Sequence, residues 1–212
     1  LYSLLEECRL ASEKINVQPT FFEGITAAAF LAFARNPADI LIMEVGMGGR
    51  LDATNVITSP IACVFTPVSL DHTEYLGNDV RTIAGEKSGI LKKGSVCVTS
   101  MQEEAAEEVI FSQAAKLSIP VIAYGYDWGV KIGLEGFQFM SQKINWDLPS
   151  PKLLGNHQFF NAGTAVATSV LALPQFKISY DHVIKGLKTV YWPARLQQIV
   201  NGNISKLLPK GW

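Results

Sequence analysis

The sequence has few of the features that mark secreted, membrane or disulfide-rich proteins. Only 3 of its 212 residues are cysteine, at positions 8, 63 and 97, and no two of them form a CxxC pair. An odd number of isolated cysteines favours reduced thiols, so we expect a cytoplasmic protein. The longest apolar run, residues 25–34, is too short to span a bilayer, and no signal peptide is recognisable.

An excess of charge of one sign is also lacking. Lys and Arg number 18 and Asp and Glu number 19, which leaves a net charge of −1. This balance gives no electrostatic reason to expect a nucleic-acid partner or an anionic membrane surface. Hydrophobic residues make up 48% and charged residues 17%, which indicates a folded domain with a sizeable core. The chain begins without Met, and its first residue already belongs to a helical pattern. Its last residues, 207–212, read as a segment about to enter another element, so we expect a fragment of a longer protein.

Strand and helix patterns alternate along the chain. Apolar spacing predicts helices over 1–15, 20–35, 79–91, 102–117, 156–173 and 180–187, and short apolar runs predict strands over 39–45, 61–68, 95–99 and 119–124. Thr20 and Glu23 have capping-box spacing, and the helix that they begin is apolar nearly all round, so it should be buried. Residues 125–150 predict a small antiparallel insert. The fold class is therefore α/β, with a mostly parallel, doubly wound sheet whose ligands bind beyond the carboxyl ends of the strands.

A glycine-rich segment follows the first expected strand. Gly46, Gly48 and Gly49 allow the backbone to approach an anion closely, and Glu44 stands where a carboxylate can hold Mg²⁺ beside phosphates. The segment is neither GxGxxG nor a Walker A sequence, so a tight turn is an equal alternative.

Two further segments carry candidate metal ligands. His72 lies in a polar cluster after the second expected strand, although that cluster could equally be a solvated loop. Lys87 falls on the helical face of Ile83 and Leu91, so its amine is either buried and modified, for example as a carbamate, or reaches water along its stem.

Two residues near the end of the chain are candidates for nucleotide contacts. Asn161 begins a strip of small residues, and its amide could pair with an adenine edge. Arg195 could bind a phosphate bidentately. A polar first helical turn capped by Asn156 and an exposed arginine after Pro193 are the alternatives.

Taken together and in order, five strings resemble one known family. EVGMGGRLDATN (44–55), SLDHTEYLG (69–77), GEKSGIL (85–91), LLGNHQFFNA (153–162) and WPARLQ (192–197) are similar to the folylpolyglutamate synthase and dihydrofolate synthase family of the Mur ligase superfamily. The resemblance covers essentially the whole chain and implies the Mur ligase central domain, which is P-loop NTPase-like. It implies an ATP-dependent ligase that joins L-glutamate to dihydropteroate or a reduced folate through an acyl phosphate.

The resemblance also implies roles for the candidate residues. Glu44 and His72 would bind Mg²⁺, and a carbamylated Lys87 would help to hold a second ion. Asn161 would lie near the adenine, and Arg195 would reach the terminal phosphate. Gly46, Gly48 and Gly49 would shape the loop around the ATP phosphates. The family members are expected to be monomers.

The family's phosphate-binding loop and its C-terminal domain are missing from the sequence. We therefore expect residues 1–196 to be a central ATP-binding domain and 197–212 to begin the connection to a glutamate-ligase domain, with the segment alone inactive. Three rivals stay open: a Mur ligase of cell-wall synthesis, a nicotinamide-dependent oxidoreductase and a non-catalytic nucleotide-binding module.

Overall fold

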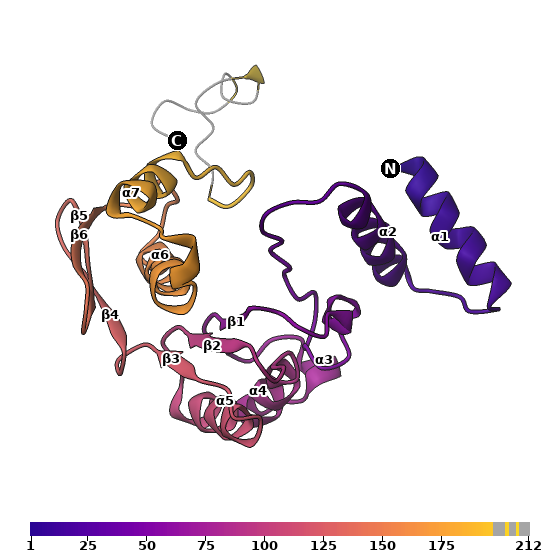
Figure 1. The fold of residues 1–212 in the computed structure, drawn as a ribbon, viewed down its shortest axis with the longest axis horizontal. Coiled ribbons are helices and arrows are strands. Elements are labelled where there is room, and N and C mark those ends of the chain that lie inside the picture. Colours follow the sequence, from indigo (N-terminus) through magenta and orange to yellow (C-terminus); the bar gives the residue numbers. More distant parts are fainter. Residues whose placement is uncertain (197–201, 204–206, 208–212) are drawn as a thin grey trace.

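A three-stranded parallel sheet organises the chain (Figure 1). The structure is a computed structural model, and it describes residues 1–196, 202, 203 and 207. The strands β1 (Ala62–Phe65), β2 (Val96–Thr99) and β3 (Val121–Ala123) lie in the order β1-β2-β3. Each lies within a strand range expected from the sequence, which confirms these three predictions.

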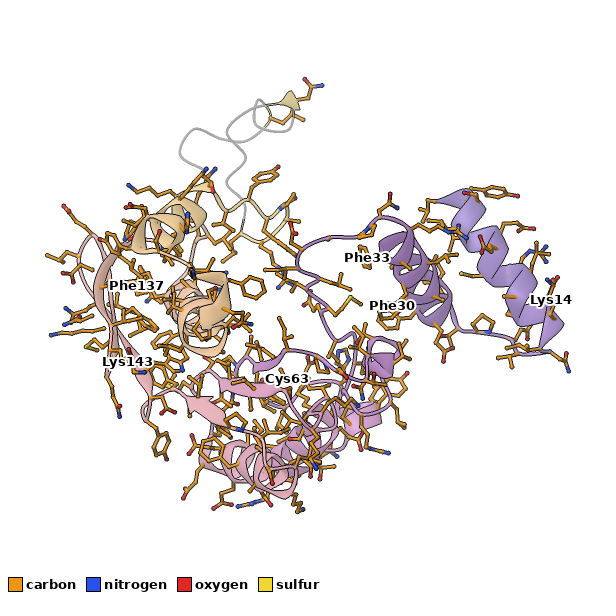
Figure 2. The ribbon with its side chains drawn as sticks, viewed as in Figure 1. Lys14, Phe30, Phe33, Cys63, Phe137 and Lys143 are labelled. Carbon is orange, nitrogen blue, oxygen red and sulfur yellow. The ribbon has the colours of Figure 1, made fainter. Side chains whose placement is uncertain are left out.

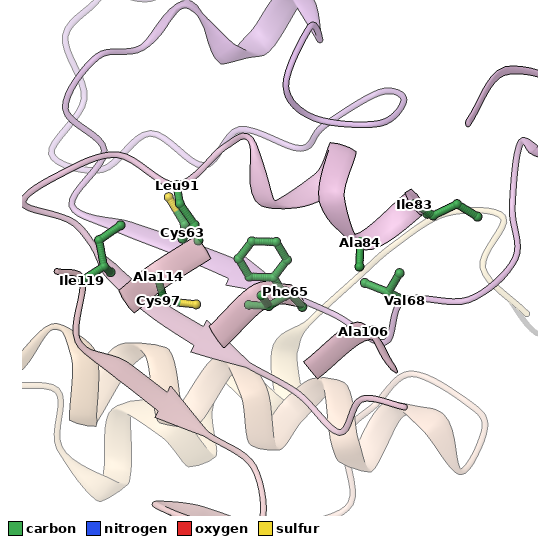
Figure 3. Close-up of a cluster of buried hydrophobic side chains, with 11 residues drawn as sticks. Cys63, Phe65, Val68, Ile83, Ala84, Leu91, Cys97, Ala106, Ala114 and Ile119 are labelled. Atoms are coloured by element: carbon green, nitrogen blue, oxygen red, sulfur yellow. The ribbon is translucent and has the colours of Figure 1, made fainter. Parts of the chain in front are cut away.

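Helices cover both faces of this sheet. On one face α4 (Val80–Ser88) and α5 (Glu104–Lys116) enclose an apolar cluster (Figure 3). On the other face α6 (His157–Val166) and the π-helical turn η2 (Ala167–Ala172) pack over the strands. Successive residues of a strand point to opposite faces, so Cys97 belongs to the first cluster and Val98 to the second. The doubly wound α/β class is confirmed.

The expected antiparallel insert is also present. The strands β4 (Trp128–Ile132), β5 (Gly136–Ser141) and β6 (Asn145–Pro149) form a separate sheet in the order β4-β5-β6. Its apolar face contacts α6, and β6 also contacts α7 (Tyr180–Thr189), which follows the short turn η3 (Pro174–Phe176).

Two helices stand apart from the sheet. α1 (Tyr2–Lys14) and α2 (Phe21–Arg35) form a hairpin at one side of the molecule, and Phe30 and Phe33 lie on it (Figure 2). The capping box is confirmed, since Glu23 N donates to Thr20 Oγ1 at 3.3 Å and Thr20 N donates to Glu23 Oε2 at 2.7 Å. The expectation that α2 is buried is wrong, because it packs mainly against α1 and leaves Phe21 85% exposed.

The strand predicted at 39–45 is also wrong. This segment has no regular secondary structure and pairs with no strand in the described residues, and Ile42 is 88% exposed. A strand requires a neighbour for its backbone N–H and C=O groups, and β1 pairs only with β2. Its apolar residues predicted a strand buried on both faces. Among the described residues no element covers this segment or pairs with it.

Two helix ends differ from the sequence pattern. α4 ends at Ser88, where the Gly89 N–H bonds to the carbonyls of Glu86 and Lys87, so the expected continuation to Leu91 is wrong. Asn156 precedes α6 without a side-chain capping bond, contrary to its expected role. No helix among the described residues has both the length and the hydropathy needed to cross a bilayer.

The two core cysteines are apolar packing groups. Cys63 and Cys97 are in register on β1 and β2, and both are buried free thiols. Burial raises the pKa of Cys97 to about 12, with a further contribution from Cys63, so this thiol stays protonated at neutral pH.

The apolar cluster beneath α5 should dominate stability. Ile110→Ala, at a fully buried position, is expected to lower the free energy of unfolding by about 2–5 kcal/mol, because it removes buried methyl groups and leaves a cavity. The control Ile61→Ala, at a 53% exposed position beside β1, should cost less than about 1 kcal/mol. Urea unfolding followed by circular dichroism measures both, and equal losses would contradict this core assignment.

Candidate functional site

The glycine-rich loop lies directly against the end of α4. An ideal Cβ on Gly49 would lie 2.8 Å from the Glu86 carbonyl oxygen and 2.9 Å from the Lys87 carbonyl oxygen. Any other residue at position 49 would therefore push the loop off the helix. The Arg50 N–H donates to the same Glu86 carbonyl at 2.8 Å, which ties the loop to the turn that carries Lys87.

Reciprocal close packing occurs on the helix side of this contact. A Cβ on Gly89 would clash with the Cα and Cβ of Arg50, so glycines on both sides of the junction allow the two backbones to meet. The Arg50 guanidinium also binds Glu86 Oε1, with Nη2 at 2.9 Å and Nε at 3.2 Å. Much of this ion pair is exposed, so it contributes little to stability. The close backbone packing at Gly49 and Gly89 is therefore what mainly holds the loop against α4.

A third segment reaches the same place. Gly48 has φ +67°, a left-handed conformation that favours glycine, and a Cβ there would lie 3.1 Å from Leu76 of α3 (Thr73–Leu76). The short helix α3 begins directly after His72. The strings that contain Gly48, His72 and Lys87, separated along the chain, are thus brought together in the fold.

Asp52 shapes the glycine loop from within. Its Oδ2 accepts hydrogen bonds from the N–H groups of Gly46 and Met47, at 3.1 and 2.9 Å, and its Oδ1 accepts from the Thr54 N–H and hydroxyl, at 2.9 and 2.6 Å. Partial burial opposes ionisation, but these hydrogen bonds outweigh it and hold the pKa of the carboxyl below its usual value. Asp52 also begins the turn η1 (Ala53–Val56).

The candidate carboxylate and imidazole are both exposed. Glu44 lies in the irregular segment that leads into the loop, and the Phe22 ring contacts Gly46 two residues later. His72 has φ 49°, so it bends the chain sharply ahead of α3. Asp71 accepts the His72 N–H at 2.8 Å, and its other carboxylate oxygen lies 3.7 Å from His72 Nε2.

Lys87 lies beside the apolar cluster but is not fully enclosed. Ile83, one helical turn before Lys87 on α4, is buried, and so is Leu91 beyond the end of the helix, whereas Lys87 itself is half-buried. No hydrogen bond or ion pair of its amine occurs within the described residues. The amine therefore has no carboxylate partner among these residues.

The donor set suits a magnesium ion that also binds nucleotide phosphates. Within the described residues no three His, Cys, Asp or Glu side chains gather closely enough to hold a metal alone. Mg²⁺ commonly takes one or two carboxylates and completes its shell with phosphates and water, so the exposed Glu44 carboxylate is chemically suited to such an ion.

The remaining two candidates lie on other elements. Asn161 is exposed on α6, where its Nδ2 donates to Gln158 Oε1 at 3.2 Å, and Arg195 is exposed after α7. No hydrogen bond or ion pair joins either side chain to the glycine loop in the part of the chain that the structure describes. The expected domain connection at 197–212 lies almost entirely outside that part.

Three residues near the site had no role assigned from the sequence. Asp52 carried a readable signal, because an Asp two residues before Thr54 is typical of a turn in which the side chain accepts a backbone N–H. Glu86 and Gln102 carried no such signal. Their partners, the Arg50 guanidinium and the backbone of residues 66–68, are 34 to 36 positions away in sequence.

Comparison with known proteins identifies the family. The Mur ligase middle domain pattern matches residues 2–169. The chain belongs to the Mur ligase middle domain family. The dihydrofolate synthase/folylpolyglutamate synthase of Mycobacterium tuberculosis is 38% identical over 194 residues, which are 84% of this chain and 39% of that protein.

Solved structures agree with this Mur ligase assignment. The apo form of L. casei FPGS aligns with TM-score 0.82 at 33% identity over 91% of this chain and 48% of its own. E. coli FolC, in complex with DHPP and ADP, aligns with TM-score 0.77 at 29% identity over 86% of this chain and 42% of its own. The chain thus spans less than half the length of these Mur ligase relatives.

Substitution of Gly49 tests the junction between the loop and α4. Gly49→Ala places a methyl group against two backbone carbonyls that cannot rotate away, so we expect a loss of about 1–3 kcal/mol in the free energy of unfolding. The control Gly85→Ala lies inside α4 with nothing within 4 Å of the new Cβ and should be stabilising by about 0.5–1 kcal/mol. Denaturant unfolding of both variants decides, and a neutral Gly49→Ala would show that the contact is loose.

Acidification tests the role of the Asp52 charge. Because the folded-state pKa is below the unfolded one, ionised Asp52 stabilises the fold above about pH 3.9, and this contribution is lost as the pH falls through the folded value. Asp52→Asn should therefore cost about 1 kcal/mol at neutral pH and progressively less on acidification. Unfolding at a series of pH values measures the difference from wild type, and a constant difference would exclude an electrostatic cause.

Proposed function

We propose that the protein containing this chain is an ATP-dependent amide ligase that adds L-glutamate to dihydropteroate, to folates, or to both. The observation that carries the proposal is the meeting of the glycine loop, the His72 segment and the Lys87 turn at one place. A relative that matches 84% of this chain bears the name dihydrofolate synthase/folylpolyglutamate synthase, and the E. coli relative is solved with ADP and DHPP.

The first part of the proposal concerns the metal. Glu44 and His72 bind Mg²⁺ together with the ATP phosphates, and the ion offsets phosphate charge when it is bound. The unpaired amine of Lys87 is carbamylated by CO₂, which turns it into an oxygen ligand for a second ion. The absence of a carboxylate partner for Lys87 in the described residues supports this role.

The second part concerns the nucleotide. Gly46, Gly48 and Gly49 shape the loop whose backbone faces the phosphates, while Asp52 fixes its curvature. The Asn161 amide contacts the adenine, and the Arg195 guanidinium contacts the terminal phosphate.

The chemistry follows from the poor reactivity of a free carboxylate. ATP transfers its terminal phosphoryl group to the pterin carboxylate, which gives an acyl phosphate and ADP. The glutamate amine then attacks the acyl carbon, loses a proton, and expels phosphate to form the amide. The chain's own residues act by positioning and by electrostatic stabilisation of the phosphates.

The domain organisation is part of the same proposal. The chain spans 39% of the M. tuberculosis relative and 48% of the L. casei one. Residues 1–196 serve as the central ATP-binding domain, with the phosphate-binding loop and the glutamate-binding domain supplied by other parts of a cytoplasmic, monomeric protein. The chain alone is then inactive.

A direct assay separates the ligase classes. The full-length protein should release ADP in the presence of ATP and Mg²⁺ only when both L-glutamate and either dihydropteroate or a reduced folate are present. A UDP-muramoyl substrate should give no release. ADP release with the UDP-muramoyl substrate would instead indicate a cell-wall ligase, and ATP binding without release under any condition would indicate a non-catalytic module.

Lys87→Ala tests the carbamate. We expect kcat to fall at least about 100-fold, because an oxygen ligand beside the transferred phosphate is lost. The free energy of unfolding should change by less than about 1 kcal/mol, since the amine has no partner to lose. Short carboxylic acids such as acetate should restore part of the activity, and the exposed control Lys93→Ala should behave as wild type. Wild-type turnover in Lys87→Ala would refute the carbamate.

A further inference from the structure

One side chain joins the exits of two neighbouring strands. Gln102 follows β2 and precedes α5, and its amide bonds to the chain that leaves β1. Gln102 Oε1 accepts from the Val68 N–H at 2.9 Å, and Gln102 Nε2 donates to the Thr66 carbonyl at 2.9 Å. The partners determine the orientation of the amide, because only its oxygen can accept the N–H and only its nitrogen can donate to the carbonyl.

Two bonds from one planar group fix direction as well as position. A single bond would allow the segment after β1 to swing about the contact, whereas two bonds on either side of Pro67 constrain its orientation. The Ser100 N–H donates to the Phe65 carbonyl at 2.8 Å, so a backbone hydrogen bond joins the ends of β1 and β2. The Gln102 side chain continues this connection at residues 66–68.

The constrained segment leads straight to His72. Val68 is buried, whereas the next three residues, 69–71, are exposed. Among the described residues, the bonds from Gln102 are the only side-chain hydrogen bonds that reach 66–71 from outside that segment. The direction in which the chain leaves residue 68 therefore constrains where His72 lies at the start of α3.

We infer that Gln102 is a positioning residue for the metal-binding function of His72. The inference rests on the proposed function, because it takes His72 as a metal ligand. Gln102 itself touches neither metal nor nucleotide in this assignment. It acts through the backbone of residues 66–68, as outer-shell hydrogen bonds commonly orient metal ligands.

The experiment uses the full-length protein and counts bound metal without turnover. Free Mn²⁺ is titrated by electron paramagnetic resonance in the presence of AMPPCP. Gln102→Met keeps the length of the side chain and removes both hydrogen bonds, and it should raise the Mn²⁺ Kd about 10-fold. Gln102→Glu keeps the acceptor for Val68 but sets a carboxylate against the Thr66 carbonyl, and it should also weaken Mn²⁺ binding.

A matched control separates positioning from general destabilisation. Gln113 is a similarly half-buried glutamine on α5 without a hydrogen bond of this kind, so Gln113→Met should leave the Mn²⁺ Kd unchanged. In steady-state assays the Gln102 variants should raise the KM for Mg²⁺ more than they lower kcat at saturating Mg²⁺. If Gln102→Met does not fold, Gln102→Glu carries the same comparison.

The possible failures are distinguishable. An Mn²⁺ Kd within about twofold of wild type in a folded Gln102 variant would overturn the positioning role. Wild-type protein that binds Mn²⁺ but releases no ADP with glutamate and a pterin acceptor would overturn the proposed function instead. A raised Kd in that inactive protein would still support the effect of Gln102 on metal binding.

Discussion

The close approach of two backbones at Gly49 is the contact on which the candidate site depends. Because position 49 has no Cβ, the loop reaches the carbonyls of Glu86 and Lys87, and the Arg50 N–H can bond to the first of them. This contact brings a loop and a helix that are separated by more than thirty residues into one local structure. It also places the loop on the turn of α4 that carries Lys87.

The surrounding interactions give this junction its shape. Asp52 draws the N–H groups of Gly46 and Met47 inward and so bends the loop, while the left-handed conformation of Gly48 lets it meet Leu76. The parallel sheet contributes at a distance, since β1 and β2 end at the same edge and direct the residues after them there. Local hydrogen bonds define the glycine loop, and the sheet positions the segments that follow β1 and β2.

The polar residues that organise the site are not those that would do the chemistry. Asp52, Glu86 and Gln102 each bond to backbone or to a neighbouring side chain, so their role is to hold other groups in place. Glu44 and His72, in contrast, are exposed, and Lys87 has no partner in the described residues. Such a separation between ligand-binding groups and the residues that hold them in place is expected of the proposed site, because outer-shell hydrogen bonds orient groups that must stay free for ligands.

The order of elements, the doubly wound α/β class and the antiparallel insert follow from the sequence, because apolar periodicity and turn residues are local properties that each segment carries with it. The cap of α2 at Thr20 and Glu23 was readable for the same reason. The expected burial of α2 and the expected strand at 39–45 were wrong, because both depend on whether another element packs against the segment. Ile42 is 88% exposed. The meeting of the Gly49, His72 and Lys87 segments, and the bonds of Gln102 to residues 66–68, were decided only by the tertiary structure, because contacts between residues so far apart in sequence leave no periodic trace along the chain.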